Sequence, residues 1–235
     1  MSYIVKYEDI GLKDYKETWD YQVLVFNGLV EKKTQRKEPE LPQEPGALIF
    51  VEHPHVYTLG KSGSENNLLI DNFQLRVKDA KFYKIDRGGD ITYHGPGQIV
   101  GYPIFDLEAL KTGLKEYISK LEEVIILTIA EYGIIGSRLN GGTGVWIDPD
   151  NKSRARKICA IGVKVSRYVT MHGFAFNVNT NLSYFDYINP CGFTDKGVTS
   201  LAKELGRPLD MNEVKEILKS KMIGVFDLEM VNNLS

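Results

Sequence analysis

The sequence has little that would direct it to a membrane or to nucleic acid. Its longest apolar runs, such as Val124 to Leu127 and Ile158 to Val163, are far shorter than the roughly twenty residues that span a bilayer. Its 29 basic and 31 acidic residues give a formal net charge of -2, so overall charge does not favour binding to nucleic acid. We therefore expect a protein that binds neither membranes nor nucleic acid.

Cysteine is also scarce, since Cys159 and Cys191 are the only two. Charged residues interrupt any apolar segment near the first residue, so no secretory signal peptide is evident, and we expect a cytoplasmic protein with two free thiols. Cys159 lies in an apolar strand and is most simply a core residue. Cys191 lies between Pro190 and Gly192, which predicts a loop, where a thiol can be reactive.

The spacing of apolar residues predicts an α/β fold of the α+β type. Apolar positions recur at helical spacing in residues 15–30 and 113–132 and again after Asp210. Strands are expected at residues 2–7, 47–52, 91–93, 99–105, 143–147, 158–165 and 169–178. Neither an internal repeat nor an interdomain linker is evident. We expect a single domain over residues 1–235, built on a mixed β-sheet flanked by helices.

Other segments predict local features that bear on the fold. Residues 31–46 are charged and then rich in proline, which favours a solvated loop. Residues 53–60 are expected to form a turn, and Pro103 to mark an edge strand or a strand end. His53 and His55 are two residues apart, as metal ligands can be, but no acidic residue or cysteine joins them at ligand spacing. We therefore expect no metal site.

The stretch from Arg87 to Gln98 holds the densest mixture of glycines and polar side chains. Four of its twelve residues are glycines, which let a backbone approach a ligand closely and expose its N–H groups. Arg87 offers a fork of donors for a carbonyl, carboxylate or phosphate group. Two tight turns with an incidental arginine and histidine are the alternative. The density of polar groups favours a binding site.

A predicted hairpin further along the chain carries small residues on both arms. Ala160 and Gly162 lie on the first strand, and Gly173 and Ala175 lie on the second. Small side chains on adjacent strands leave room above a sheet for a helix or for a ligand chain. Lys157 begins the first strand, where an amine can lower the pKa of a nearby thiol or move protons. A solvated hairpin lysine is the alternative.

The sequence blocks around these residues resemble the lipoyl(octanoyl) transferases. The signature stretch 87–98 is followed by Gly101 to Pro103, and similar blocks occur in family order at residues 53–60, 144–146, 157–163, 172–177 and 190–192. The resemblance covers roughly residues 47 to 200. It implies the α/β catalytic domain shared with lipoate ligases and biotin protein ligases.

That resemblance also implies a reaction. An octanoyl group would move from octanoyl-acyl carrier protein to a lysine on the lipoyl domains of 2-oxo-acid dehydrogenases and on the glycine-cleavage H protein. This is the first step of endogenous protein lipoylation. Because a thioester is already activated, the reaction needs neither ATP nor a metal or other cofactor.

The same resemblance assigns roles to particular residues. The cysteine that carries the acyl group as a thioester corresponds to Cys191, and the assisting lysine corresponds to Lys157. The substrate-contacting positions correspond to Arg87, Gly88, Gly89, Asp90, Ile91, Thr92, Tyr93, His94, Ala160, Ile161, Gly162, Gly173, Phe174 and Ala175. His94 or His172 could assist Lys157 in taking a proton from the acceptor amine, which is mostly protonated at neutral pH.

Two other functions are compatible with parts of this pattern. An ATP-dependent lipoate or biotin-type protein ligase would share the fold, the glycine-rich arginine motif and a lysine, but it would not need Cys191. A non-catalytic acyl-binding module would keep the pocket and would tolerate the loss of both Cys191 and Lys157. The presence of both residues favours the transferase.

Overall fold

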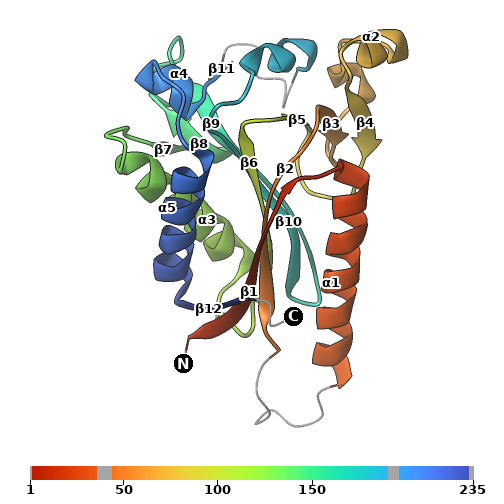
Figure 1. Ribbon diagram of the computed structural model, residues 1–235, viewed down its shortest axis with the longest axis vertical. Coiled ribbons are helices and arrows are strands. Elements are labelled where there is room, and N and C mark those ends of the chain that lie inside the picture. Colours follow the sequence, from red (N-terminus) through yellow and green to blue (C-terminus); the bar gives the residue numbers. More distant parts are fainter. Residues whose placement is uncertain (1, 36–43, 190–195, 233–235) are drawn as a thin grey trace.

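The computed structural model of the protein describes residues 2–35, 44–189 and 196–232. These residues form a mixed nine-stranded sheet and a separate three-stranded sheet, with helices on both faces of the larger one (Figure 1). The expected fold class is therefore confirmed. Cys191, the predicted acyl carrier, lies outside the described residues.

The larger sheet combines parallel and antiparallel pairs. Its strands lie in the order β12 (Leu228–Asn232), β1 (Tyr3–Leu12), β2 (Gly46–Glu52), β6 (Gln98–Ile104), β10 (Val169–Asn177), β9 (Arg156–Ser166), β8 (Gly142–Ile147) and β7 (Ser137–Leu139). β1 is parallel to both β12 and β2. From β2 across the sheet to β7, each strand is antiparallel to its neighbour. The short β11 (Gly197–Val198) pairs in parallel with β9.

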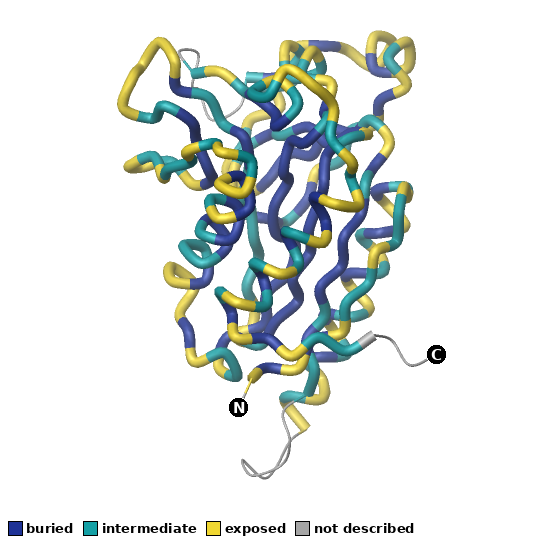
Figure 2. The backbone as a smooth tube through the Cα atoms, turned by 60° about the vertical axis from the view of Figure 1, so that its left-hand side comes forward, coloured by how far each residue is buried: buried dark blue, intermediate teal, exposed yellow. Residues whose placement is uncertain are grey.

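Helices cover the two faces of this sheet unequally. α1 (Tyr15–Gln35) lies on one face, while α3 (Leu114–Ala130) and α5 (Met211–Phe226) lie on the other (Figure 1). With both faces covered, the central strands β6 and β10 are buried along their whole length, and the dark blue trace in Figure 2 shows this buried centre. Among the described helices, none is long and apolar enough to cross a bilayer.

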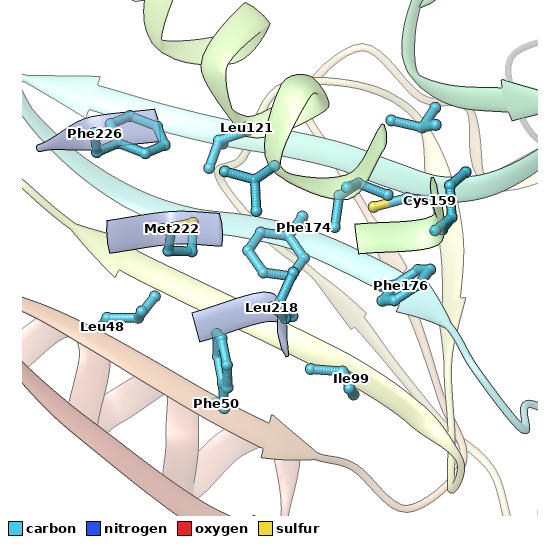
Figure 3. Close-up of a cluster of buried hydrophobic side chains, with 14 of the residues drawn as sticks. Leu48, Phe50, Ile99, Leu121, Cys159, Phe174, Phe176, Leu218, Met222 and Phe226 are labelled. Atoms are coloured by element: carbon cyan, nitrogen blue, oxygen red, sulfur yellow. The ribbon is translucent and has the colours of Figure 1, made fainter. Parts of the chain in front are cut away.

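Each face has its own hydrophobic core. On the side of α3 and α5, Phe174 and Phe176 of β10 pack with Leu121 and Met222 (Figure 3). On the opposite side, residues such as Val100 of β6 pack against α1. Burial of this apolar surface is the main force that holds the helices to the sheet.

The three-stranded sheet presents the glycine-rich stretch to the larger sheet. Its strands lie in the order β4 (Lys81–Lys84), β3 (Val56–Leu59) and β5 (Ile91–His94). A separate core packs Tyr57, Tyr93 and Leu75 beneath it. The shorter helical elements are η1 (Glu65–Asn67), α2 (Asn72–Val77), η2 (Leu182–Tyr187) and α4 (Leu201–Leu205).

Two local expectations are wrong, and a third is correct only in part. Residues 53–60 are not simply a turn, because Val56–Leu59 form the middle strand of the smaller sheet. The loop expected at residues 31–46 is helical from Glu31 to Gln35, and residues 36–43 lie outside the described residues. A charged helical turn exposed to water lacks the apolar periodicity that would distinguish it from a loop in the sequence. Pro103 lies near the end of β6 as expected, but β6 is an interior strand between β2 and β10.

A local break in the sheet accommodates that proline. Pro103 has no N–H to donate to β10. On β10, His172 adopts a left-handed backbone conformation with φ of 61°, and its N–H donates instead to Oε1 of Gln22 on α1 at 3.3 Å. Regular pairing between β6 and β10 resumes at Gly101 and Phe174. The helix therefore takes up the N–H of His172 where the pairing is interrupted, while the carbonyl oxygen of Pro103 accepts from the hydroxyl of Thr170 on β10 at 2.8 Å.

The close approach of β6 and β10 gives a stability prediction at Gly173. A Cβ there would lie 2.2 Å from the carbonyl oxygen of Gly101, so Gly173→Ala should lower the free energy of unfolding by about 1–3 kcal/mol. Gly28, in the middle of α1, is the matched control because a Cβ there meets nothing within 4 Å. Gly28→Ala should stabilise the protein by about 0.5–1 kcal/mol. Urea denaturation measures both, and equal stability of Gly173→Ala and wild type would contradict the packing argument.

Candidate active site

A cavity lies where the two sheets meet. Strands β6, β9 and β10 provide much of its lining, and Tyr15 at the start of α1 adds to it. β5 of the smaller sheet and residues 196–198 complete the wall. Because these elements come from distant parts of the sequence, the cavity exists only in the folded chain.

Most of the site residues predicted from the sequence line this cavity. Those that line it are Arg87, Ile91, Thr92, His94, Lys157, Ala160, Ile161, Gly162, Gly173, Phe174 and Ala175. Gly88, Gly89, Asp90 and Tyr93 do not. Three segments that are far apart in the sequence are thus brought together around one space.

Arg87 and Asp90 hold the glycine-rich loop in shape. The guanidinium of Arg87 is nearly buried, and its Nη2 donates to the carbonyl and the hydroxyl oxygen of Thr58 at 2.7 and 3.0 Å. The carboxylate of Asp90 accepts hydrogen bonds from the N–H of Ile91 at 2.6 Å and from Nδ2 of Asn67 at 2.7 Å. Both charged groups therefore form hydrogen bonds within the protein, and these bonds fix the loop before a ligand arrives.

From Thr92 to His94 the side chains of β5 alternate between two environments. Thr92 and His94 face the cavity, whereas Tyr93 is fully buried in the core of the smaller sheet. The Tyr93 hydroxyl is 2.8 Å from Nδ1 of His55, and its ring stacks on Tyr184. This is the alternation expected of any strand, and it makes Tyr93 a supporting residue behind the cavity wall.

The small residues of the β9–β10 hairpin serve two purposes. Ala160 and Ala175 are cross-strand partners and leave apolar space in the cavity beside Val100. The space above Gly162 is filled by the protein itself, since a Cβ there would lie 2.9 Å from the carbonyl oxygen of Gly88. Gly173 is likewise required by the neighbouring strand. Only the alanine pair fits the prediction of room for a ligand chain.

Lys157 reaches the cavity because β9 is irregular. Its Nζ lies 4.6 Å from the centre of the Trp146 ring on β8. Trp146 pairs with Lys157 while Val145 pairs with Cys159, so Ile158 is an extra residue on β9. Such a bulge changes the direction of the flanking side chains. Lys157 and Ala160, which a regular strand would place on opposite faces, therefore line the same cavity.

Comparison with known proteins identifies the family. Residues 14–223 match the family model described as the lipoyl protein ligase A/B catalytic domain. An octanoyltransferase from Flavobacterium psychrophilum is 54% identical over 98% of this chain and 100% of its own length. Another, from Bacteroides fragilis, is 56% identical over 92% of this chain and 95% of its own. The chain belongs to the octanoyltransferase family.

Solved structures of other proteins share the fold of this chain. The bipartite lipoate protein ligase from Thermoplasma acidophilum is 12% identical, with a TM-score of 0.70 over 99% of this chain and 87% of that one. The biotin protein ligase from Aquifex aeolicus in complex with biotin and ATP is 11% identical, with a TM-score of 0.53 over 95% of this chain and 70% of that one. These likenesses confirm the expected fold, whereas the closer sequence relatives support an enzyme that transfers octanoyl groups.

Two histidines line the octanoyltransferase cavity, and neither is freely available. His94 is buried, with Nδ1 2.9 Å from Oε1 of Gln98, and burial lowers its pKa to about 3. The Nε2 atom of His172 is 3.0 Å from Asp86, whose other oxygen accepts from Nζ of Lys164 at 2.6 Å. The hydrogen bond from His172 and the nearby ammonium hold the pKa of Asp86 well below its usual range. The described residues contain no group of side chains arranged to bind a metal.

Sequence reasoning missed several residues that line the cavity. Tyr15, Val100, Tyr102 and Asn177 all contribute to the wall. Tyr15 begins an amphipathic helix, where an aromatic residue is indistinguishable from a core residue in the sequence. By contrast, Cys159 was correctly expected in the core, where burial raises the pKa of its thiol.

Burial of His94 predicts a pH dependence of stability. In the unfolded chain this histidine titrates near pH 6.5, whereas the folded protein keeps it neutral down to about pH 3. Between those values the unfolded state binds one more proton, so stability falls as the pH falls, by about 1.4 kcal/mol per pH unit. From pH 7 to pH 5, His94→Gln should lose about 2 kcal/mol less stability than wild type in urea titrations. Between pH 8 and pH 7 the two proteins should change in parallel, and parallel curves down to pH 5 would refute the assignment.

Proposed function

We propose that this enzyme takes its octanoyl group from octanoyl-acyl carrier protein and transfers it, through a thioester on Cys191, to the target lysine of lipoyl domains and of the glycine-cleavage H protein. The observation that carries the proposal is the position of Lys157, whose amine lies at the wall of a largely apolar cavity. The role of Cys191 rests on its sequence motif. Val198, which follows Cys191 by seven residues, pairs with Lys157, and this pairing supports a place for Cys191 in the same site.

The first half of the proposed reaction loads the enzyme. The thiolate of Cys191 attacks the carbonyl carbon of the donor thioester, and the carrier leaves as a thiol after taking up the proton of Lys157, whose amine is then neutral. A positive Lys157 stabilises the thiolate before attack. Because one thioester replaces another, the step needs no external source of energy.

The second half transfers the acyl group to an amine. The acceptor lysine arrives mostly protonated, since its ordinary pKa is about 10.4, so a base must remove a proton before it attacks the Cys191 thioester. An amide bond forms and the Cys191 thiolate leaves. We assign the base to Lys157. His172 also lines the cavity, but its Nε2 is already engaged with the carboxylate of Asp86 at 3.0 Å.

The octanoyl chain itself would lie in the apolar part of the cavity. Ala160, Ala175 and Val100 line adjacent strands there, and each buried CH₂ contributes about 0.8 kcal/mol to binding. The neutral state of His94 suits this role, because a charged imidazole beside an apolar chain would be unfavourable.

The covalent intermediate can be tested by mass spectrometry of the intact protein. Mixing the enzyme with octanoyl-acyl carrier protein without ATP should give an octanoyl adduct that hydroxylamine removes. Cys191→Ser should give no such adduct, whereas Cys159→Ser is the matched control and should react as wild type. An adduct on Cys191→Ser would disprove the assignment. Turnover only with free octanoate and ATP would instead support a ligase.

When a lipoyl domain is added as the acceptor, Lys157→Met tests the second half-reaction. Methionine keeps the unbranched side chain but removes the amine, so amide formation at pH 7 should fall by roughly 100-fold or more. Lys152→Met, on the exposed turn after β8, is the control and should retain normal turnover. Normal amide formation by Lys157→Met would remove this lysine from the mechanism.

Ala160 borders open cavity space, whereas Gly162 is packed against the Arg87–Gly88 loop, so enlarging each residue should affect chain-length preference differently. Ala160→Leu should fill cavity space and reduce the rate with octanoyl donors more than with butyryl donors. Gly162→Leu should displace the Arg87–Gly88 loop and reduce the rate with both. Competition assays with mixed acyl donors measure the ratio. An unchanged octanoyl-to-butyryl ratio in Ala160→Leu would show that the chain lies elsewhere.

A further inference from the structure

A buried carboxylate outside the cavity contacts the strand that supports Lys157. Glu122 lies on α3, on the face that packs against the sheet, and is nearly buried. Its Oε1 accepts a hydrogen bond from the N–H of Gly144 on β8 at 3.0 Å. Its Oε2 accepts one from Nε of Arg138 at 3.1 Å. The proposed chemistry gives Glu122 no role, and burying a carboxylate is costly unless it is paired.

Gly144 occupies a place that only glycine can fill. Its φ of 111° is strongly disfavoured for residues with a side chain, and a Cβ would lie 2.4 Å from the carbonyl oxygen of Cys159. Within the described strands, Gly144 has no partner in the register of either β7 or β9. Its N–H is therefore held by a side chain from the helix layer.

This irregular residue lies two positions before Trp146, the residue that supports Lys157. The register between β8 and β9 shifts between Val145 and Trp146, so that Trp146 pairs with Lys157 and skips Ile158. If Gly144 relaxed into regular pairing, Trp146 would face Ile158 instead. The amine of Lys157 would then lose the indole ring beneath it and leave the cavity wall.

We propose that Glu122 is a positioning residue for Lys157. By accepting the Gly144 N–H, its carboxylate holds β8 in the irregular register that places the Trp146 ring under the Lys157 amine. The consequence for catalysis rests on the proposed function of Lys157. The effect of Glu122 on the position of Lys157 does not rest on that function, so it can be tested by a readout that is independent of turnover.

Tryptophan fluorescence provides that readout. The chain has two tryptophans, so Trp19→Phe leaves Trp146 as the only one. In this background, Lys157→Met should change the emission of Trp146, because it removes the cation above the ring. The same substitution is then made together with Glu122→Gln, which keeps an acceptor oxygen, or with Glu122→Met, which has similar volume but no such acceptor. This double-mutant cycle measures whether Lys157 and Trp146 still interact.

We expect the effect of Lys157→Met on emission to persist with Glu122→Gln and to disappear with Glu122→Met. With Lys157 intact, Glu122→Met should lower kcat for octanoyl transfer by on the order of 100-fold, with KM for the acceptor little changed, because the amine is misplaced. Glu122→Gln should stay within about threefold of wild type. Glu123→Ala is the matched control, since Glu123 also pairs with Arg138 whereas the Gly144 N–H donates to Glu122.

Two results would overturn the proposal. One is an undiminished effect of Lys157→Met on emission in the Glu122→Met protein. The other is loss of that effect with Glu122→Gln, which would exclude the hydrogen bond to Gly144 as the cause. The second result remains decisive if Glu122→Met does not fold. Should Lys157→Met retain full turnover, the proposed function fails, while the emission cycle still tests the role of Glu122.

Discussion

The cavity depends on the attachment of the small sheet to the β9–β10 hairpin. Asp86, at the end of the small sheet, binds both Lys164 on β9 and His172 on β10. One residue beyond Arg87, the N–H of Gly88 donates to the carbonyl oxygen of Val163 at 2.9 Å. An ion pair, a charge-assisted hydrogen bond and a backbone hydrogen bond within three residues fix one sheet against the other, and the space between them is what a ligand can enter.

This attachment explains how far the site could be predicted from the sequence. The density of glycines and polar groups between Arg87 and Gln98 indicated a binding loop, and part of that loop lines the cavity. The small residues of the hairpin indicated room above the sheet for a helix or a ligand chain. What approaches Gly162, however, is the loop itself, because the Gly88 carbonyl occupies that space. Single residues specify how near a neighbour can come, but only the tertiary fold specifies which neighbour it is.

Strand register was the second limit on prediction. Successive side chains of a strand point to opposite faces of the sheet, so the predicted strand already implied that Tyr93 and its neighbours Thr92 and His94 lie on different faces. The bulge at Ile158 could not be inferred, because it depends on pairing with β8 and on Gly144. The position of Lys157 was therefore identified by resemblance to a family, and the physical reason for its direction became visible only in the register.

The parallel pairing of β1 with β12 has a consequence for how this fold forms. Tyr3 pairs with Leu228, so residues 225 positions apart meet in neighbouring strands. Contacts of such long sequence separation form late, because closing a long loop costs entropy before any contact compensates for it. During synthesis on the ribosome, β1 can pair with β2 well before β12 emerges. Its outer edge stays open until residues 228–232 arrive, and an open edge can pair with other chains.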